Sequence, residues 1–388
     1  MLCRTRLLSL PAAISVVLFL QSTNSPCLVR AQSNIASSSN WPEDNLNRTS
    51  VNLREFRSGG PGKDGIPSLT QPRFVPAFPR SQSFNPGEPV IVYRDGKAVR
   101  GYPLSLLLWH EIVNDTVNGR SIAVTFCPLC NAAIVFDRRV DGRVLEFGVS
   151  GLLRNSDMIM YDRQTQSWWQ QFTGECLAGK LAGQRLQIVP SELVSYQDFQ
   201  KAYPVGQILS MDTSYVRAYG TNPYQGYDQS TTPFLYDGRI DPRLPPMERV
   251  LGVISGSAAR AYPYTLLEKK TLVNDNIDGK PIVVVSDART LSVLDQAQIS
   301  KSKRILSPRV FHARAGGRNL TFGLQRGKMT DDQTSSTWNN SGSCEAGPLR
   351  GSALSPLAGA FPSFAFAWFA FHPKSTVYSV PNERLKPL

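Results

Sequence analysis

The chain has 388 residues, of which 41% are hydrophobic, so it can bury substantial cores and most naturally forms about two domains of ~150 residues each. This composition excludes a chain that is disordered throughout. The formal net charge is +12, but the basic residues are scattered and form no Lys/Arg-rich stretch. The charge pattern therefore argues against nucleic-acid binding.

The first 31 residues have the pattern of a secretory signal peptide. Arg4 and Arg6 precede an apolar stretch from Leu7 to Leu20, and the small-residue pattern Val29-Arg30-Ala31 follows. The apolar stretch is too short for a good membrane span, and no later stretch reaches the ~20 apolar residues that crossing a bilayer requires. We expect cleavage after Ala31, a secreted extracellular protein, and no transmembrane segment in the mature chain.

Residues 32–65 are predicted to form a disordered linker, because they are rich in Ser, Asn, Gly and Pro and carry little that could fill a core. This segment contains Asn47, which lies in an Asn-x-Thr/Ser acceptor pattern for N-glycosylation. Among four such patterns, we expect only Asn47 to carry a glycan.

The next elements predict strands followed by one short helix. Residues 90–93 and 98–102 flank an Asp95-Gly96 turn, which is the pattern of a β-hairpin. Pro103 then stands where the first turn of a helix tolerates proline, and apolar residues follow at helical spacing up to Asn114.

The remaining pattern is mostly that of antiparallel sheet. Residues 121–126 form a β-rich run, and residues 133–136 and 144–149 predict a second hairpin. Short helices are expected over Tyr196–Tyr203 and over the aromatic run Phe364–His372. The fold class is therefore α+β, mostly antiparallel sheet with a few short helices.

Internal similarity divides the chain into two degenerate tandem copies of one such domain. Residues 101–120 reappear as residues 261–280 at a constant offset of 160, for example 263 minus 103. After an insertion, residues 135–148 match residues 310–323, and Gly174-Glu175-Cys176 matches Gly342-Ser343-Cys344. We expect a first repeat over residues 66–245 and a second, degenerate repeat over residues 246–388.

Only the first copy contains the Cys127-Pro128-Leu129-Cys130 element, which directly follows a predicted strand. Three interpretations are open. As a redox site, one thiolate attacks a substrate disulfide and the other resolves it, with the attacking thiolate favoured by His110, Arg138 or Arg139. As a metal site, the pair binds copper or zinc with His110 as a further ligand and Cys176 as the next candidate.

The third interpretation is a permanent disulfide that stiffens the loop. The second copy argues against a purely structural role, since Asp287, Thr290 and Lys270 stand where the first copy has Cys127, Cys130 and His110. A residue set that is absent from a copy that still folds is not required by the fold.

Signal cleavage leaves four cysteines in a compartment where thiols are usually oxidised. Cys176 and Cys344 occupy matching positions of the two copies. If the copies pack about a pseudo-twofold axis, these two residues approach one another and can form an inter-domain disulfide; otherwise we expect two unpaired buried thiols.

Several strings resemble a large, uncharacterised microbial family of secreted proteins known as a domain of unknown function with a Cys-Pro-x-Cys element. The resemblance covers roughly residues 66–378 and rests on residues 109–115, 126–131, 147–152, 155–157, 160–163 and 372–373. Some relatives are described as selenoproteins, which implies redox chemistry at Cys127 and Cys130, because selenium supplies a more acidic and more nucleophilic group. The family pattern does not include Cys176 or the insertion near residues 291–307.

The sequence thus predicts a secreted thiol–disulfide oxidoreductase in which Cys127 or Cys130 is the nucleophile, the other resolves, and His110 tunes the thiolate. Its partner would be a protein thiol or disulfide. The alternatives are a copper- or zinc-binding protein that uses Cys127, Cys130 and His110, and a non-catalytic extracellular interaction module.

Overall fold

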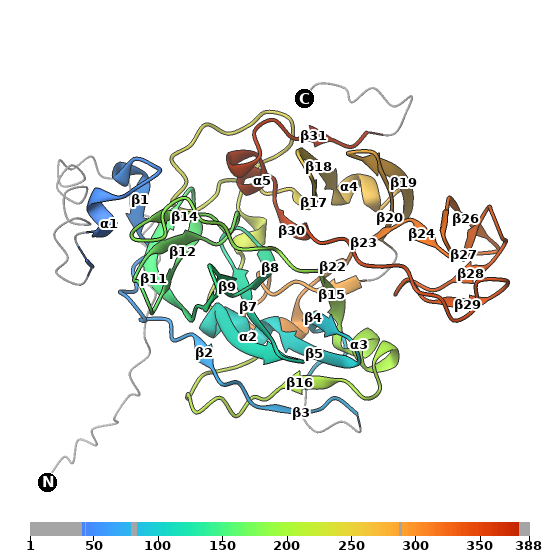
Figure 1. Cartoon of the computed structure of the whole chain (residues 1–388), viewed down its shortest axis with the longest axis horizontal. Coiled ribbons are helices and arrows are strands. Elements are labelled where there is room, and N and C mark those ends of the chain that lie inside the picture. Colours follow the sequence, from blue (N-terminus) through green and yellow to red (C-terminus); the bar gives the residue numbers. More distant parts are fainter. Residues whose placement is uncertain (1–40, 43, 79–83, 287–288, 380–388) are drawn as a thin grey trace, which may run out of the picture.

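The computed structural model describes residues 41–379 except residues 43, 79–83 and 287–288. The expected signal peptide, residues 1–31, and the first part of the expected linker lie outside the described residues. The described chain is mostly antiparallel sheet with a few short helices, as expected for the α+β class (Figure 1). Among the described helices, none has the length and apolar character that a bilayer span requires.

The N-terminal half, residues 56–209, is built on three main sheets. The first sheet contains the predicted hairpin of β4 (Pro89–Asp95) and β5 (Ala98–Pro103), in which Val90 pairs with Pro103. Its other strands are β15 (Ser191–Ser195) beside β4, and β16 (Gln207–Leu209) and β3 (Phe74–Pro76) beyond β5. Helix α2 (Leu104–His110) begins directly after Pro103, as predicted, but it ends at His110 instead of near Asn114, because residues 112–117 pair as a strand.

The second sheet follows α2 along the chain. It contains β6 (Ile112–Val117), β7 (Arg120–Cys127) and β8 (Ala132–Asp137), with β2 (Leu69–Thr70) beside β6. After the small hairpin of β9 (Arg139–Val140) and β10 (Arg143–Val144), a third sheet has the strand order β1-β11-β12-β13-β14. These strands are β1 (Phe56–Ser58), β11 (Phe147–Arg154), β12 (Asp157–Asp162), β13 (Trp168–Gln170) and β14 (Cys176–Ala178), and α3 (Tyr196–Ala202) follows β15.

The C-terminal half, residues 249–377, follows the same order of elements. Its first sheet is β30-β17-β18-β31, its second is β19-β20-β23, and its third is β26-β27-β28-β29. The bounds are β17 (Arg249–Ser255), β18 (Ala258–Pro263), α4 (Tyr264–Leu267), β19 (Leu272–Ile277), β20 (Lys280–Val285), β23 (Arg309–His312), β24 (Arg314–Ala315), β25 (Arg318–Asn319), β26 (Phe322–Gln325), β27 (Lys328–Asp331), β28 (Thr337–Trp338), β29 (Cys344–Ala346), β30 (Ala360–Phe364), α5 (Ala365–Phe371) and β31 (Thr376–Val377). An additional hairpin, β21 (Arg289–Leu291) with β22 (Arg304–Leu306), lies within the insertion between β20 and β23.

The same polar contacts support both halves. In each, a buried tyrosine hydroxyl donates to an aspartate at 2.6 Å, and an indole N–H donates to an aspartate at 2.9 Å. The pairs are Tyr102–Asp115 and Tyr262–Asp275 for the hydroxyl, and Trp169–Asp162 and Trp338–Asp331 for the indole. These contacts are therefore part of the scaffold.

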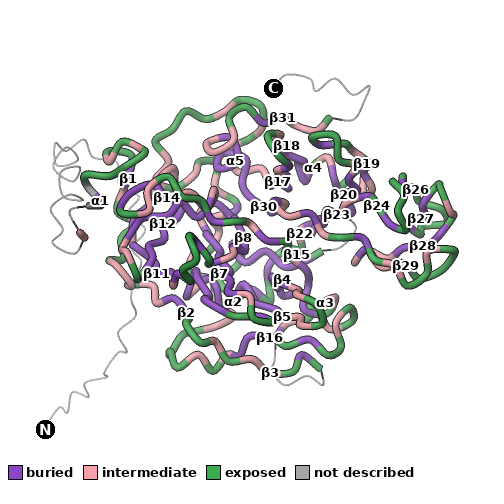
Figure 2. The backbone as a smooth tube through the Cα atoms, in the orientation of Figure 1, coloured by how far each residue is buried: buried purple, intermediate pink, exposed green. Residues whose placement is uncertain are grey.

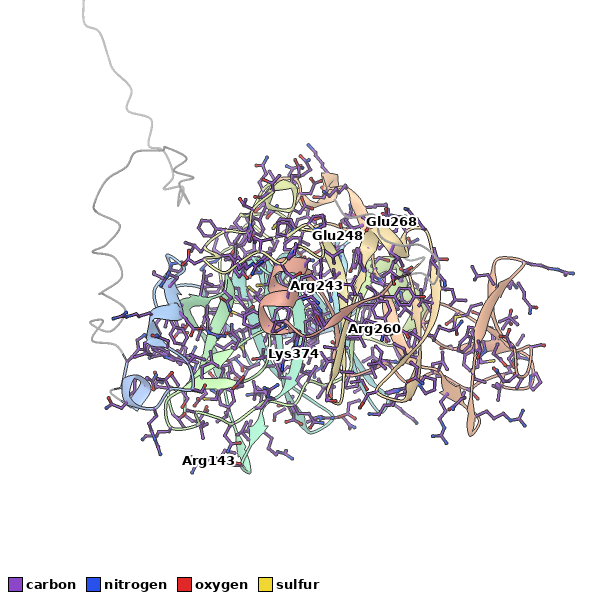
Figure 3. All side chains as sticks on the ribbon, turned by 90° about the horizontal axis from the view of Figure 1, so that it is seen from above. Arg143, Arg243, Glu248, Arg260, Glu268 and Lys374 are labelled. Carbon is purple, nitrogen blue, oxygen red and sulfur yellow. The ribbon has the colours of Figure 1, made fainter. Side chains whose placement is uncertain are left out.

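One large hydrophobic core joins the two halves. The predicted closing helix is α5, and its aromatic residues are buried against the N-terminal half: Phe172 stacks on Phe371, with ring centroids 4.8 Å apart. By contrast, the sheet β26–β29 lies at the periphery, where buried residues of its own small cluster alternate with exposed ones (Figures 1 and 2). Charged side chains are spread over the surface, with Arg143 and Arg260 on different parts of it (Figure 3).

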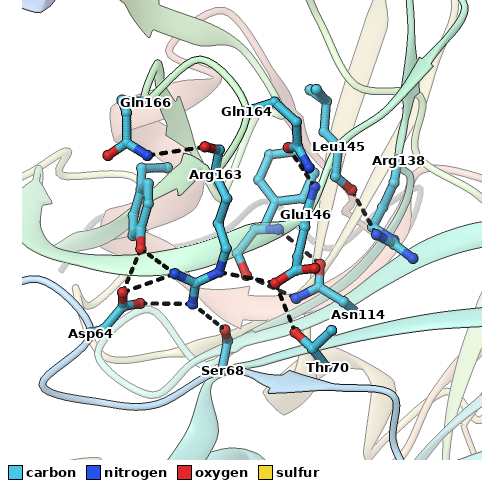
Figure 4. A network of polar contacts seen from close by, with 12 residues as sticks. Asp64, Ser68, Thr70, Asn114, Arg138, Leu145, Glu146, Arg163, Gln164 and Gln166 are labelled. Carbon is cyan, nitrogen blue, oxygen red and sulfur yellow. Dashed lines mark hydrogen bonds and ion pairs between the residues drawn. The ribbon is translucent and has the colours of Figure 1, made fainter. Parts of the chain in front are cut away.

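The prediction that the whole of residues 32–65 is a disordered linker is wrong for its C-terminal part. Residues 44–47 form α1 (Asp44–Asn47), and β1 pairs with β11. Asp64 accepts from both terminal nitrogens of Arg163 at 3.0 and 3.1 Å, and Arg163 also bonds Glu146 at 3.0 Å (Figure 4). The segment is ordered because its few apolar residues and ion pairs complete the edge of the third sheet.

The two halves are connected by residues 210–248, here called the strap. Within it the structure describes only one short 3₁₀-helix, η4 (Tyr227–Gln229). Such a long irregular connection is uncommon in a compact domain and is often functional. Four of its tyrosines pack against the large hydrophobic core, namely Tyr219, Tyr224, Tyr227 and Tyr236.

The matched residues Asn114 and Asn274 give a test of this scaffold. Each side chain bonds the backbone N–H and C=O of one partner residue, Phe147 or Phe322, at 2.8–2.9 Å, but only Asn114 is buried. We expect Asn114→Ala to lower the free energy of unfolding by about 1–3 kcal/mol, because two buried backbone groups lose their partners. Asn274→Ala should lower the free energy of unfolding by clearly less, because water can replace the exposed amide. Urea unfolding measures both changes, and equal shifts of the urea midpoint in the two variants would contradict this account.

Candidate functional site

The cysteine pair lies at the turn between β7 and β8. Cys127 is the last residue of β7, and Cys130 stands two residues before β8 begins. Asn131 closes the turn with a left-handed φ of 51°, and its N–H donates to Pro128 O at 3.1 Å. Both thiols point inward, with Cys127 1% exposed and Cys130 0% exposed.

A second hairpin meets this turn. Asn155 and Ser156 form the tight turn between β11 and β12, each with a left-handed φ. Ser156 O faces both thiols, at 3.5 Å from Cys130 Sγ and 3.9 Å from Cys127 Sγ. The next residue, Asp157, brings a carboxylate oxygen to the pair, so that the two Sγ atoms and this oxygen all lie within 4.8 Å of one another.

Only one of the two oxygens of the Asp157 carboxylate accepts hydrogen bonds from N–H groups. Its Oδ2 accepts from Gln170 Nε2 at 2.7 Å and from the Phe172 N–H at 2.9 Å. Its Oδ1 is buried and accepts no N–H or O–H hydrogen bond among the described residues, and the other groups that act on this carboxyl are the thiols of Cys127 and Cys130. A buried carboxylate oxygen whose only possible donors are weak S–H groups is poorly satisfied, so this atom marks a place for a ligand.

The electrostatic surroundings of the pair are negative. Burial raises the pKa of both thiols, and the nearby Asp157 carboxylate raises them further. Burial also raises the pKa of Asp157 to about 6 and that of Glu111 to about 8. The thiols are thus mostly protonated at neutral pH, the opposite of an activated nucleophile.

Glu111 was not singled out from the sequence. It caps α2 with a left-handed φ of 56°, which is rare for a residue with a side chain, and its carboxyl is buried between Asp157 and the strap residue Tyr224. A backbone held in such a conformation costs of order 1 kcal/mol and is a feature of functional sites.

His110 does not join the cysteines, contrary to its expected roles as ligand and as thiolate-tuning group. Its Nδ1 lies 2.7 Å from Pro67 O and its Nε2 lies 2.6 Å from Tyr219 Oη. A carbonyl only accepts, so Nδ1 carries the proton and Nε2 accepts from Tyr219. Burial lowers the pKa of His110 to about 4, and the neutral ring fastens the strap to α2.

The two expected arginines also lie elsewhere. Arg138 donates to three carbonyl oxygens, those of Ile122, Leu145 and Asp115, and so supports the sheet. Arg139 is exposed in β9. The cation that a reactive thiolate needs is therefore not supplied by any of the residues that the sequence suggested.

Cys176 and Cys344 are free, buried thiols in the structure, so the inter-domain disulfide is not formed and the alternative of two unpaired thiols is the one observed. Each lies in its own half, in β14 and β29, and each donates to the carbonyl two residues further on, at 3.6 and 3.4 Å. The cysteines belong to different hydrophobic clusters. Equivalent positions of the two halves are not close to each other here, and the geometry also leaves Cys176 out of the Cys127 cluster.

The fold and the site define a mostly antiparallel β-sheet protein with a buried cluster of two thiols and one carboxylate. Comparison with family models places residues 63–375 in the family described as "Protein of unknown function (DUF3179)". This match spans most of the chain, so the protein belongs to that family. No curated protein and no solved structure was found to match it.

Thiol reactivity tests the electrostatics of the site. In folded, chelator-treated protein at pH 7 we expect Cys127 and Cys130 to react with an aromatic disulfide reagent at least about a hundredfold more slowly than after denaturation, because burial and a raised pKa both suppress the thiolate. Peptide mass spectrometry assigns the label. Rapid labelling of either cysteine in the folded protein would reveal an activated nucleophile and contradict this description.

Proposed function

We propose that the protein is a metal-binding protein that holds one transition-metal ion through Cys127, Cys130 and Asp157. The observation that carries this proposal is the convergence of two thiols on a buried carboxylate whose second oxygen has no N–H or O–H donor among the described residues. Asp157 takes the place that the sequence had suggested for His110. Two sulfur ligands and one oxygen ligand suit a borderline or soft metal ion.

The charges of the site support a cation as the missing component. Each of the three groups is held toward its neutral form by burial, and Glu111, which interacts with Cys127 and Asp157, is a further acid rather than a cation. A bound cation reverses this preference, because it favours the thiolates and the carboxylate together. The same groups that make a poor nucleophile make a good metal site.

The ligand set favours zinc over copper(I). Copper(I) is satisfied by two thiolates, which leaves the Asp157 oxygen still unpaired and the cluster more negative. A divalent ion neutralises more of this charge and uses the carboxylate. Zinc usually takes four ligands, and Ser156 O, which already faces both thiols, is a candidate for the fourth.

We also infer that the two halves are degenerate copies of one domain, supported by their shared order of elements and shared polar contacts. In the C-terminal half Thr290 replaces Cys130 and Thr271 replaces Glu111. The β26–β27 hairpin is also shorter, with strands of 4 residues each against 8 and 6 in β11 and β12, so nothing corresponds to Ser156 or Asp157. The site residues are lost together while the scaffold contacts remain, which favours a functional role.

Thiol–disulfide exchange is the second candidate. It is favoured by the short separation of Cys127 and Cys130, whose sulfur atoms share one carbonyl partner. Burial and the absence of a cation among the groups acting on the pair count against it. If the chain is exported, as its first residues suggest, a bound metal would also keep the two thiols from oxidation in an oxidising compartment.

Metal analysis of the purified protein tests the proposal directly. We expect about one equivalent of zinc per chain, lost in Cys127→Ser/Cys130→Ser and bound about 10–100-fold more weakly in Asp157→Asn, since a ligand is removed. His110→Gln and Cys176→Ser are matched controls that should bind as the wild type does. Wild-type affinity in Asp157→Asn, or a metal-free protein with a reducible Cys127–Cys130 bond, would refute the metal site; the second result would establish the redox alternative.

The pH dependence of zinc affinity gives a separate prediction. Both thiols have a raised pKa and must lose their protons on binding, so affinity should rise with pH through the neutral range, with about two protons released per ion. Below about pH 6 the Asp157 carboxyl is protonated as well, and the release should approach about three protons. Calorimetry in buffers of different ionisation enthalpy measures this number; a pH-independent affinity would be inconsistent with thiolate ligands.

A further inference from the structure

Two residues that lie much later in the chain donate hydrogen bonds to the Cys127–Cys130 turn. The Tyr227 hydroxyl donates to Leu129 O at 3.1 Å, and the Phe364 N–H donates to Cys130 O at 2.8 Å. The rings of Tyr227 and Phe364 also meet edge to face, with centroids 5.9 Å apart. Two successive carbonyls of the turn are therefore bound by the strap and by the C-terminal half.

The residue after Tyr227, Asp228, contacts the C-terminal half instead of the cysteine turn. Asp228 Oδ2 accepts from Ser292 Oγ at 2.7 Å and lies 3.2 Å from Arg249 Nη2 and 3.3 Å from Lys303 Nζ. Its side chain is 0% exposed. Because both residues lie in η4, a single turn of 3₁₀-helix connects the cysteine turn to this buried charge cluster.

The charge cluster depends on the insertion of the C-terminal half. Ser292 and Lys303 lie within residues 291–307, for which the N-terminal half has no counterpart. The insertion also bonds the strap through its backbone: Gly226 N donates to Asp295 O at 2.7 Å, and Asn222 N donates to Ala297 O at 2.8 Å. The insertion thus binds η4 and the strap residues next to it through side chains and backbone.

We propose that η4 and the insertion form a lock that keeps the cysteine turn closed and sets the rate at which metal enters and leaves the site. Tyr227 is a positioning residue in this lock, and Asp228 fixes it to the C-terminal half. The second half thereby acts on the site of the first. The metal part of this inference rests on the proposed function, whereas the closure of the turn does not.

The test compares two aspartates, Asp228 of the strap and Asp275 of the C-terminal half. Asp228→Asn keeps the shape of the side chain but removes the charge that Arg249 and Lys303 bind. Asp275→Asn is the matched control, because Asp275 also binds an arginine and a hydroxyl, those of Arg260 and Tyr262, away from the strap. Tyr227→Phe removes only the hydroxyl and serves as a second test that leaves the charge cluster intact.

Two rates are measured on full-length protein: zinc transfer to an excess of a chromophoric chelator, and labelling of Cys127 and Cys130 by a small alkylating reagent in metal-free protein. We expect Asp228→Asn and Tyr227→Phe to raise both rates about tenfold or more, with unchanged zinc stoichiometry. Asp275→Asn should leave both rates unchanged, whatever its effect on the melting temperature.

Unchanged rates in Asp228→Asn and Tyr227→Phe would overturn the lock. Equal acceleration in Asp275→Asn would do the same, since it would show a general loss of stability. If the wild-type protein binds no zinc, the proposed function fails, but the labelling rates of the metal-free variants still decide whether η4 closes the turn.

Discussion

The central constraint of the site is that a carboxylate and two thiols are buried together without a positive charge among the groups that act on them. Asp157, Cys127 and Cys130 come from two separate hairpins, and neither hairpin alone would hold them at this separation. Burial of such groups is unfavourable, so the surrounding sheets, the strap and the C-terminal half must supply the stability that keeps them in place. A cation would satisfy all three groups at once, and this makes metal binding the simplest account of the arrangement.

The contrast between the halves separates scaffold from site. Tyr102–Asp115 and its counterpart Tyr262–Asp275 have the same geometry, so these contacts serve the fold in both places. The cysteines, Glu111 and the extended β11–β12 hairpin occur only in the N-terminal half. A strained, buried acid beside two thiols is costly to maintain, and the C-terminal half shows that the fold does not need it.

Much of the fold could be predicted from local patterns. The Asp95-Gly96 turn, Pro103 before α2 and the aromatic run of α5 are local signals, and each element formed where its signal stands. The site was only half predictable, because Asp157 approaches the cysteines through the pairing of distant strands, which sequence spacing does not reveal. The predicted role of His110 beside the cysteines was wrong for the same reason. Its neighbours Pro67 and Tyr219 are distant in the chain, and they form hydrogen bonds with both ring nitrogens. Cys176 and Cys344 matched in sequence but lie in separate sheets.

The bond from the Phe364 N–H to Cys130 O has a consequence for the order of events during synthesis. The N-terminal half is synthesised first, whereas Tyr227 and Phe364, which bind the carbonyls of Leu129 and Cys130, belong to chain made later. The turn therefore gains these two partners only after both cysteines have been made, so its final closure depends on the end of the chain rather than on the hairpin alone.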